Sequence, residues 1–187
     1  MRHLRLIQNN ITSHYAVYIV DNFLESDYHK QILEKVIELT QKDSMAQQTN
    51  VKANMTKFTE LLNHKLFEKM FMMSVELLQM FFTLRSPSPT NPYEYIIDEA
   101  WAMKHMKGNN TIEHIHGCEY FSCAYYPRVP GETTMSFSDF GCFETLKENS
   151  LYIFHGLTKH AVLPQQYDEP RYSIAFNILQ KNMKNRL

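Results

Sequence analysis

The sequence predicts an α+β, mainly β fold, in which a two-sheet barrel or jelly roll has N-terminal helices packed on one of its sheets. Three observations lead to this prediction. The first half of the chain contains two amphipathic stretches with helical spacing. The second half contains short alternating segments separated by Gly, Pro, Asn and Asp. Apolar residues make up 44% of the 187 residues and aromatic residues 13%, which is enough to build a single hydrophobic core.

The helical stretches are recognised by the spacing of their apolar residues. After a suitable N-cap, apolar residues recur at helical spacing from Ile32 to Leu39, which predicts a helix from Ser26 to Lys42. The segment Thr56–Leu84 carries a wide stripe of Leu, Met and Phe, which predicts a second, longer helix packed against a sheet. Three prolines between Ser86 and Pro92 end this helix in a loop.

The strand segments begin with an early one near Tyr15–Val20 and resume after Pro92. Eight segments follow: Tyr93–Ile97, Glu99–Met106, Thr111–His116, Tyr120–Pro127, Thr133–Phe137, Leu151–Phe154, His160–Leu163 and Tyr172–Leu179. Strands of this number and length are typical of two packed sheets, so they favour a two-sheet barrel or jelly roll.

The charge balance and the cysteines limit the partners and the compartment. With 19 Lys and Arg against 20 Asp and Glu the formal net charge is −1, so we expect no binding to bulk nucleic acid or to an anionic membrane. Cys118, Cys123 and Cys142 form an odd set without a C-x-x-C pair, which indicates a reducing, cytoplasmic location. Polar residues interrupt the most apolar run, Met70–Phe82, so no membrane span is predicted.

The sharpest local feature is the sequence Glu113-His114-Ile115-His116. On an extended strand residues i and i+2 share a face about 6.5–7 Å apart, so His114 and His116 can bind one metal ion. His160 is the best third ligand, because its strand would neighbour the first in a jelly roll. The pair alone also fits hydrogen-bonded core histidines or histidines on a solvated face.

A second feature is the last predicted strand, which begins near Arg171. Its two-residue period gives it an apolar face of Tyr172, Ile174, Phe176 and Ile178 and an opposite face of Arg171, Ser173, Ala175 and Asn177 that points into the barrel. A guanidinium there needs an anion, since a buried unpaired charge is costly, and its planar fork matches a carboxylate. That carboxylate can come from a ligand, or from Asp139 or Glu119.

Several short motifs follow one another through the second half of the chain. They are Trp101, Gly108, His114-Ile-His116, Phe121-Ser-Cys-Ala-Tyr-Tyr126, Pro130-Gly-Glu-Thr133, Ser138-Asp139, Leu151-Tyr-Ile-Phe154, His160-Ala-Val and Arg171-Tyr-Ser173. In this order they resemble the iron(II) and 2-oxoglutarate dependent oxygenases, most closely the prolyl-hydroxylase-like and phage-type branch. The resemblance implies a double-stranded β-helix and a single oxygenase-like domain over residues 1–187, with 1–92 as a helical support region and 93–180 as the jelly-roll core with the metal site.

The resemblance also implies roles for individual residues. His114, His116 and His160 fall on the metal-ligand positions, and no catalytic residue separate from these ligands is expected. Arg171 and Ser173 fall on the groups that hold the distal carboxylate of 2-oxoglutarate. Tyr126 resembles a tyrosine that hydrogen-bonds this cosubstrate. Residues expected in the second shell or near the substrate are Trp101, Tyr120, Tyr125, His155 and Asn177.

The implied activity is that of a 2-oxoglutarate-dependent dioxygenase with Fe(II) as the metal and ascorbate as a reductant. In such an enzyme 2-oxoglutarate is converted to succinate and CO2 while an unactivated C–H bond is hydroxylated. A peptide, an amino acid or a small metabolite all stay open as the substrate, and so does an oxidation other than hydroxylation. We expect a monomer or a homodimer.

His116 departs from the pattern of most of the family, which has a carboxylate at this position. Three neutral imidazoles leave the full charge on the ion. An all-nitrogen site does not discriminate strongly against zinc, nickel or copper, so the identity of the metal stays open. Glu119 or Asp139 could supply a carboxylate instead. Two other classes fit part of the pattern: a cupin-type metal protein that uses no 2-oxoglutarate, and a structural zinc domain that adds Cys118. The pair Arg171 and Ser173 favours the oxygenase, because a cupin has no standing need for it.

Overall fold

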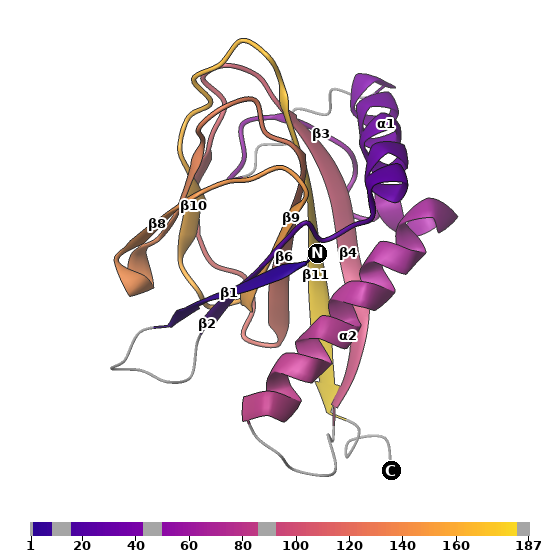
Figure 1. Ribbon diagram of the computed structural model, residues 1–187, viewed down its shortest axis with the longest axis vertical. Helices are drawn as coiled ribbons and strands as arrows, with labels where there is room; N and C mark the ends of the chain where they lie inside the picture. The colour runs from indigo at the N-terminus through magenta and orange to yellow at the C-terminus, as the bar shows by residue number, and fades with distance from the viewer. Residues whose placement is uncertain (1, 9–15, 43–49, 86–92, 183–187) are drawn as a thin grey trace.

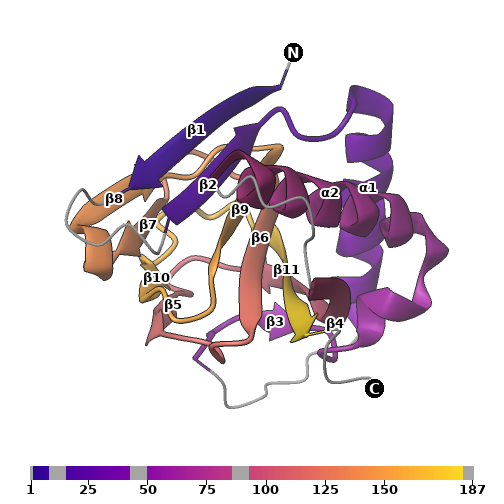
Figure 2. The ribbon, with the colours of Figure 1, turned by 90° about the horizontal axis from the view of Figure 1, so that it is seen from below.

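The computed structural model describes residues 2–8, 16–42, 50–85 and 93–182, and it contains two antiparallel sheets with helices on the outer side of the larger one (Figure 1, Figure 2). The larger sheet runs in the order β1 (His3–Gln8), β2 (Ala16–Asp21), β9 (Ser150–His155), β6 (Tyr120–Arg128), β11 (Arg171–Asn182), β4 (Tyr93–His105) and β3 (Asn54–Met55). The smaller sheet runs β5 (Thr111–His114), β10 (His160–Val162), β7 (Thr134–Phe137) and β8 (Cys142–Thr145). A short 3₁₀ helix, η3 (Ser138–Phe140), joins β7 to β8. The predicted mainly β jelly roll is confirmed.

Helix α1 spans Ser26–Lys42, the bounds that the sequence predicts. Its buried residues Ile32, Val36 and Leu39 belong to the core cluster that also contains the outer face of the larger sheet. Asp27 lies in the first turn, where its negative charge is favourable beside the partial positive charge of the helix N-terminus. The amphipathic pattern therefore translates directly into packing at this helix.

The predicted helix over Thr56–Leu84 is wrong in its first part. Helix α2 spans only Glu68–Arg85, and two short 3₁₀ helices precede it, η1 (Glu60–Asn63) and η2 (Lys65–Phe67). Before η1 the backbone hydrogen-bonds to strand β4: Thr56 N–H donates to the Ala102 carbonyl at 3.0 Å, and Ala100 N–H donates to the Phe58 carbonyl at 2.6 Å. Pairing with the edge of the sheet thus overrides the helical periodicity of this segment.

Every predicted strand corresponds to an observed one, but some bounds differ. The two segments predicted on either side of Asp98 are the single strand β4, whose register against β11 shifts between Asn177 and Ile178. Strands β1, β3 and β8 were not predicted, and because β1 and β3 lie within residues 1–92, that region contributes strands as well as helices. The predicted loop Ser86–Pro92 and the residue Tyr15 lie outside the described residues.

Alternation along the central strands separates a core under the helices from a cavity between the sheets. On β11, Tyr172, Ile174, Phe176 and Ile178 are buried with the helices. The opposite residues, Arg171, Ser173, Ala175 and Asn177, line the cavity, as the sequence predicts. On β4, Ala100 and Ala102 lie under the helices, and Trp101, Met103 and His105 line the cavity. The fold therefore gathers polar groups inside the barrel while the apolar groups anchor the helices.

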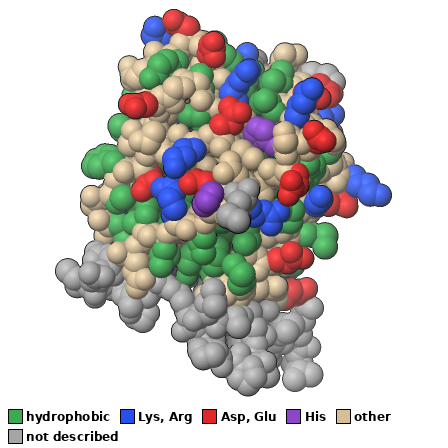
Figure 3. Space-filling model, in the orientation of Figure 1, with side chains coloured by type: hydrophobic (Ala, Val, Ile, Leu, Met, Phe, Trp, Pro, Cys, Tyr) green, Lys and Arg blue, Asp and Glu red, His purple; other side chains and the backbone are tan. Residues whose placement is uncertain are grey.

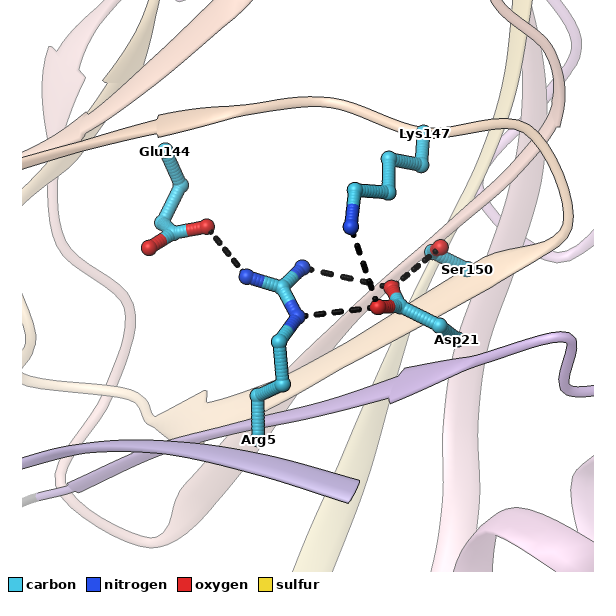
Figure 4. A network of polar contacts seen from close by, with 5 residues as sticks. All are labelled: Arg5, Asp21, Glu144, Lys147 and Ser150. Carbon is cyan, nitrogen blue, oxygen red and sulfur yellow. Dashed lines mark hydrogen bonds and ion pairs between the residues drawn. The ribbon is translucent and has the colours of Figure 1, made fainter. Parts of the chain in front are cut away.

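An ion-pair network joins the N-terminal strand to both sheets (Figure 4). Arg5 on β1 donates from Nε and Nη2 to the two oxygens of Asp21 at 2.9 and 3.2 Å, and from Nη1 to Glu144 on β8 at 2.7 Å. Asp21 also accepts from Ser150 Oγ at 2.8 Å and from Lys147 Nζ at 3.3 Å. Arg5 thus connects the larger sheet to the smaller one.

The surface fits the near-zero net charge. On the face that Figure 3 shows, Lys and Arg side chains are interspersed with Asp and Glu, and neither sign dominates a broad area. Among the described helices, none has the length and apolar character needed to cross a bilayer.

Candidate metal centre and its cavity

The three predicted metal ligands converge at the end of the smaller sheet. His114 ends β5, His160 begins β10, and the two residues lie opposite each other in the antiparallel pairing of these strands. His116 follows β5 in a loop. One nitrogen atom from each histidine can be chosen so that the three lie within 4.8 Å of one another, close enough for one metal ion. The sequence prediction that these three histidines come together is therefore met by the geometry.

Backbone carbonyls fix the tautomer of two of these rings. His114 Nδ1 lies 2.9 Å from the Ile112 carbonyl, and His160 Nδ1 lies 2.9 Å from the Thr158 carbonyl. Since a carbonyl only accepts, each Nδ1 carries the proton and donates it, which leaves the Nε2 lone pair for a metal.

Burial keeps the three imidazoles neutral. It lowers the pKa of His160 to about 3 and that of His116 to about 4, and His114 is shifted in the same direction. For His160 and His116 the neighbouring histidines add to the lowering. Neutral imidazole is the form that binds metal, so the site is ready for a cation near neutral pH.

Gly156 positions the loop that carries His116. Its carbonyl accepts from His116 N–H at 2.7 Å, and its own N–H donates to the Tyr120 carbonyl at 2.7 Å. A Cβ atom on Gly156 would lie 2.2 Å from the Gly117 carbonyl oxygen, so a side chain here must displace the loop. The close approach of two backbones explains why glycine stands at this position.

The histidines open into a cavity between the sheets with about 540 Å³ of empty space. At its inner end is Arg171, whose side chain is fully buried, and whose Nε and Nη1 atoms have no hydrogen-bond partner among the described residues. Burial lowers its pKa, and the nearby Tyr126 acts in the opposite direction. A buried guanidinium without an anion is unfavourable, so the cavity is built to receive one.

Two predicted partners of an anion lie in the same cavity. Ser173 Oγ is 3.1 Å from His105 Nε2, and burial holds the pKa of His105 well below its usual range, so this histidine is neutral. Tyr126 is buried, and its hydroxyl has only a long contact of 3.8 Å with Met135 Sδ. Both hydroxyls therefore lie where a ligand carboxylate beside Arg171 could accept from them.

The other predicted site residues divide into two groups. Trp101 and Asn177 line the cavity. Tyr125 does not, because it points to the helix side of β6 and hydrogen-bonds His29 and Asn149. Tyr120 donates its hydroxyl to Asp98, and His155 accepts from the N–H of Leu157, and neither lines the cavity. Tyr125 therefore lies on the helix side, away from the site, whereas the second-shell role of Tyr120 and His155 stays a prediction, since both adjoin Gly156, which bonds to His116.

The internal partners considered for Arg171 and for the metal are engaged elsewhere. Asp139 accepts from Lys159 N–H at 2.8 Å, and Glu119 contacts Cys118 Sγ at 3.4 Å. Within the described ranges the metal-binding cluster contains only the three histidines, so neither carboxylate nor Cys118 joins it. Three protein ligands leave room for exogenous ones, which is typical of a catalytic site and not of a closed structural zinc site.

The sequence places His105 as a possible neighbour of the metal site, but it does not predict the contact of His105 with Ser173 or the position of Glu99 in the lining. His105 and Glu99 share the inward face of β4 with Trp101, at two-residue spacing. Extending the alternation from Trp101 in both directions would have identified them.

Comparisons with known proteins show where this architecture recurs. No family model matches the sequence, and no curated protein matches it. Among solved structures, a viral collagen prolyl hydroxylase from Paramecium bursaria chlorella virus-1, in complex with 2-oxoglutarate, superposes with a TM-score of 0.62 and 14% identity, over 87% of this chain and 94% of that one. A prolyl-4-hydroxylase from Pseudomonas putida gives a TM-score of 0.64 and 12% identity, over 88% and 92% of the two chains.

A third neighbour is an epimerase. The non-heme alpha-ketoglutarate-dependent epimerase SnoN from nogalamycin biosynthesis gives a TM-score of 0.66 and 13% identity, over 87% of this chain and 76% of that one. The chain thus has the fold of the 2-oxoglutarate-dependent oxygenases, with a three-histidine cluster inside it. The same fold serves hydroxylation and epimerisation in these neighbours, so the fold alone does not select the reaction.

Proposed function

We propose that the protein is a non-haem Fe(II) and 2-oxoglutarate dependent dioxygenase that hydroxylates an unactivated C–H bond. The observation that carries this proposal is the unpaired guanidinium of Arg171 inside the cavity that His114, His116 and His160 also line. A ligand with a carboxylate at each end can satisfy the metal and Arg171 together, and 2-oxoglutarate has this form. The enzymes that share the fold support the assignment.

The chain's own residues would hold the metal and the cosubstrate. His114, His116 and His160 present neutral nitrogen ligands, and Arg171 binds the distal carboxylate through its free Nε–H and Nη1–H. With its proton on Nε2, His105 donates to Ser173 Oγ and leaves the serine hydroxyl free to donate to the same carboxylate. Tyr126 adds a further hydroxyl. When bound, the metal and 2-oxoglutarate supply oxidation of the substrate by dioxygen, with succinate and CO2 as co-products.

The charge of the site favours a dianion. Three neutral imidazoles add no negative charge to a divalent ion, and Arg171 adds a positive one. The 2-oxoglutarate dianion would therefore meet a cation at each of its ends. Because the ligand set contains only nitrogen, we expect Zn²⁺, Ni²⁺ and Cu²⁺ to compete with Fe²⁺ for it.

The same proposal covers the setting of the enzyme. We propose that residues 1–187 act as a single domain, as a monomer or homodimer in the cytoplasm, on a peptide, an amino acid or a small metabolite. The odd set of free cysteines supports a reducing compartment, and the near-zero net charge gives no support for a polyanion as the partner.

The test measures cosubstrate binding and turnover separately. Metal-depleted protein is loaded with Ni²⁺ and titrated calorimetrically with 2-oxoglutarate, and then assayed with Fe²⁺, ascorbate and O2 for succinate. We expect saturable binding that is lost in Arg171→Ala, and succinate formation that is lost in His160→Ala. Arg128→Ala and His3→Ala are matched controls, because both side chains are exposed and neither lines the cavity. No binding of 2-oxoglutarate with any divalent metal would overturn the proposal.

A further inference from the structure

A second cavity adjoins the first on the side of the metal ligands. It also has about 540 Å³ of empty space, and it shares His114, His116, Trp101 and Asn177 with the inner cavity. Because it reaches two of the three metal ligands without including Arg171, it is the space from which a substrate would approach the metal. We call it the front cavity.

The front cavity differs from the inner one in charge. Glu99 is the acidic residue of its lining, and the lining contains no Lys or Arg. The Glu99 carboxylate accepts a hydrogen bond from Asn177 Nδ2 at 3.0 Å, and among the described residues no cation forms an ion pair with it. Asn177 thus holds a negative group beside the metal site without neutralising it.

The surroundings of Glu99 add to the negative field. The pKa of the Tyr120 phenol is raised, first by its hydrogen bond to Asp98 and then by burial and by the charges of Asp98, Glu119 and Glu99. These three carboxylates have the same sign, so the rim near β4 attracts cations and repels anions.

Aromatic and polar groups of the front cavity complete a binding surface. Phe58 meets the ring of Trp101 edge to face, with centroids 4.9 Å apart, and Met55 lies beside them. An alkyl chain or a cation is well accommodated by such a wall. Trp101 is 6% exposed, and its Nε1–H has no hydrogen-bond partner among the described residues, so a ligand that supplies an acceptor would satisfy it.

We infer that the front cavity selects a substrate that carries a positive charge on an alkyl chain, with the cation against Glu99 and a hydrogen-bond acceptor against Trp101 Nε1. The two residues are two positions apart on β4 and share one face of the strand, so one substrate can reach both of them. This inference rests on the proposed function, because it names the class of substrate for the same metal site. Together the two cavities select a dianion inside and a cation in front.

The test uses the single tryptophan as its reporter, since Trp101 is the only one in the chain. Protein loaded with Ni²⁺ and 2-oxoglutarate is titrated with Nα-acetyl-lysine methylamide and with its uncharged analogue Nα-acetyl-norleucine methylamide, and tryptophan fluorescence gives each affinity. We expect the lysine derivative to bind about tenfold more tightly, which corresponds to about 1.4 kcal/mol. Glu99→Gln should remove the difference, and Glu132→Gln, in an exposed loop, should keep it.

The outcomes separate this inference from the proposed function. The calorimetric affinity for 2-oxoglutarate is measured first, and it should be the same in Glu99→Gln and in the unaltered protein. If 2-oxoglutarate binds but the two amides bind equally, or if Glu99→Gln keeps the preference, the inference is overturned and the oxygenase assignment stands. If 2-oxoglutarate does not bind to the unaltered protein, both are overturned.

Discussion

Arg5 and Arg171 both belong to strands of the larger sheet, β1 and β11, but one guanidinium is paired with carboxylates and the other is not. Arg5 forms three hydrogen bonds to Asp21 and Glu144, and although burial alone would lower its pKa, these bonds raise it. Arg171 is fully buried, two of its nitrogen atoms are unpaired, and burial lowers its pKa. A paired arginine thus holds the fold together, whereas a buried arginine with unpaired donors offers a binding place for an anion.

The largest effect should come from removing the unpaired arginine. Arg171→Met keeps the length of the side chain but removes the charge and the donors, so the affinity for 2-oxoglutarate should fall by about 100- to 1000-fold, or about 3–4 kcal/mol. Calorimetric titration of the Ni²⁺-loaded protein measures this. Arg171→Lys should recover only part of the affinity, because lysine has no planar fork. An affinity for Arg171→Met within threefold of the unaltered protein would contradict the role assigned to Arg171.

The paired arginine should behave in the opposite way. Arg5→Met leaves Asp21, a buried residue, without its main partner, so the free energy of unfolding should fall by about 1–3 kcal/mol. Chemical denaturation measures this change. The affinity for 2-oxoglutarate should stay the same, because Arg5 does not line the cavity. A loss of that affinity would mean that the two arginines are coupled through the sheet.

Removing the two arginines should also have opposite effects on the stability of the ligand-free protein. In the absence of 2-oxoglutarate, Arg171→Met replaces a buried unpaired charge by an apolar chain, and the free energy of unfolding should rise by about 1–2 kcal/mol. Urea denaturation of metal-free protein tests this. A destabilised variant would show that Arg171 has an internal partner after all.

The pH dependence of the free energy of unfolding should change in the Arg5 variant but not in the Arg171 variant, because only Arg5 is paired with Asp21. Burial would raise the pKa of this carboxyl, but its hydrogen bonds to Arg5 and Ser150 lower it below the usual value of 3.8. Its contribution to stability is therefore present above about pH 4 and is lost as the pH falls through the folded-state pKa, since the unfolded state binds the proton first. The unfolding free energy measured from pH 6 to pH 3 should fall less in Arg5→Met than in the unaltered protein. Arg171→Met should leave this loss unchanged.

The smallest effect concerns the outermost member of the network. Lys147 reaches Asp21 at 3.3 Å, but its side chain is 56% exposed, so water screens the pair. Lys147→Met should change the free energy of unfolding by less than about 1 kcal/mol. An effect as large as that of Arg5→Met would mean that Lys147 and not Arg5 holds Asp21.

The sequence predicted the parts of the site that depend on the two-residue alternation of side chains along a strand. The two-residue period alone placed Arg171 and Ser173 inside the barrel, and the jelly roll brought His160 beside His114. The same period shows why Tyr125 failed: adjacent residues of a strand point to opposite faces, so Tyr125 and Tyr126 could not both face the cavity. Applying the same alternation to every residue of β6 would have excluded either Tyr125 or Tyr126 from the cavity.

The parts that could not be predicted depend on contacts distant in sequence. The segment from Thr56 to Phe67 has a helical pattern, but the backbone of Thr56 and Phe58 hydrogen-bonds to β4, and the rest forms the short 3₁₀ helices η1 and η2. Strand β8 is short, with Cys142 and Glu144 only half-buried and its other two residues exposed, so its sequence carries little strand signal. Whether Arg171 has an internal counter-ion could be decided only by the structure, since Asp139 and Glu119 were equally plausible partners by composition.

The pairing of β5 with β10 has a consequence for the order of folding. His114 and His160 are opposite each other in space but far apart along the chain, so this part of the smaller sheet closes a long loop and should form late. A metal ion held by both strands would act as a cross-link across that loop, and would slow its opening more than it speeds its closure. With a metal ion bound, the histidine cluster would therefore make the kinetic stability of the smaller sheet depend on that ion.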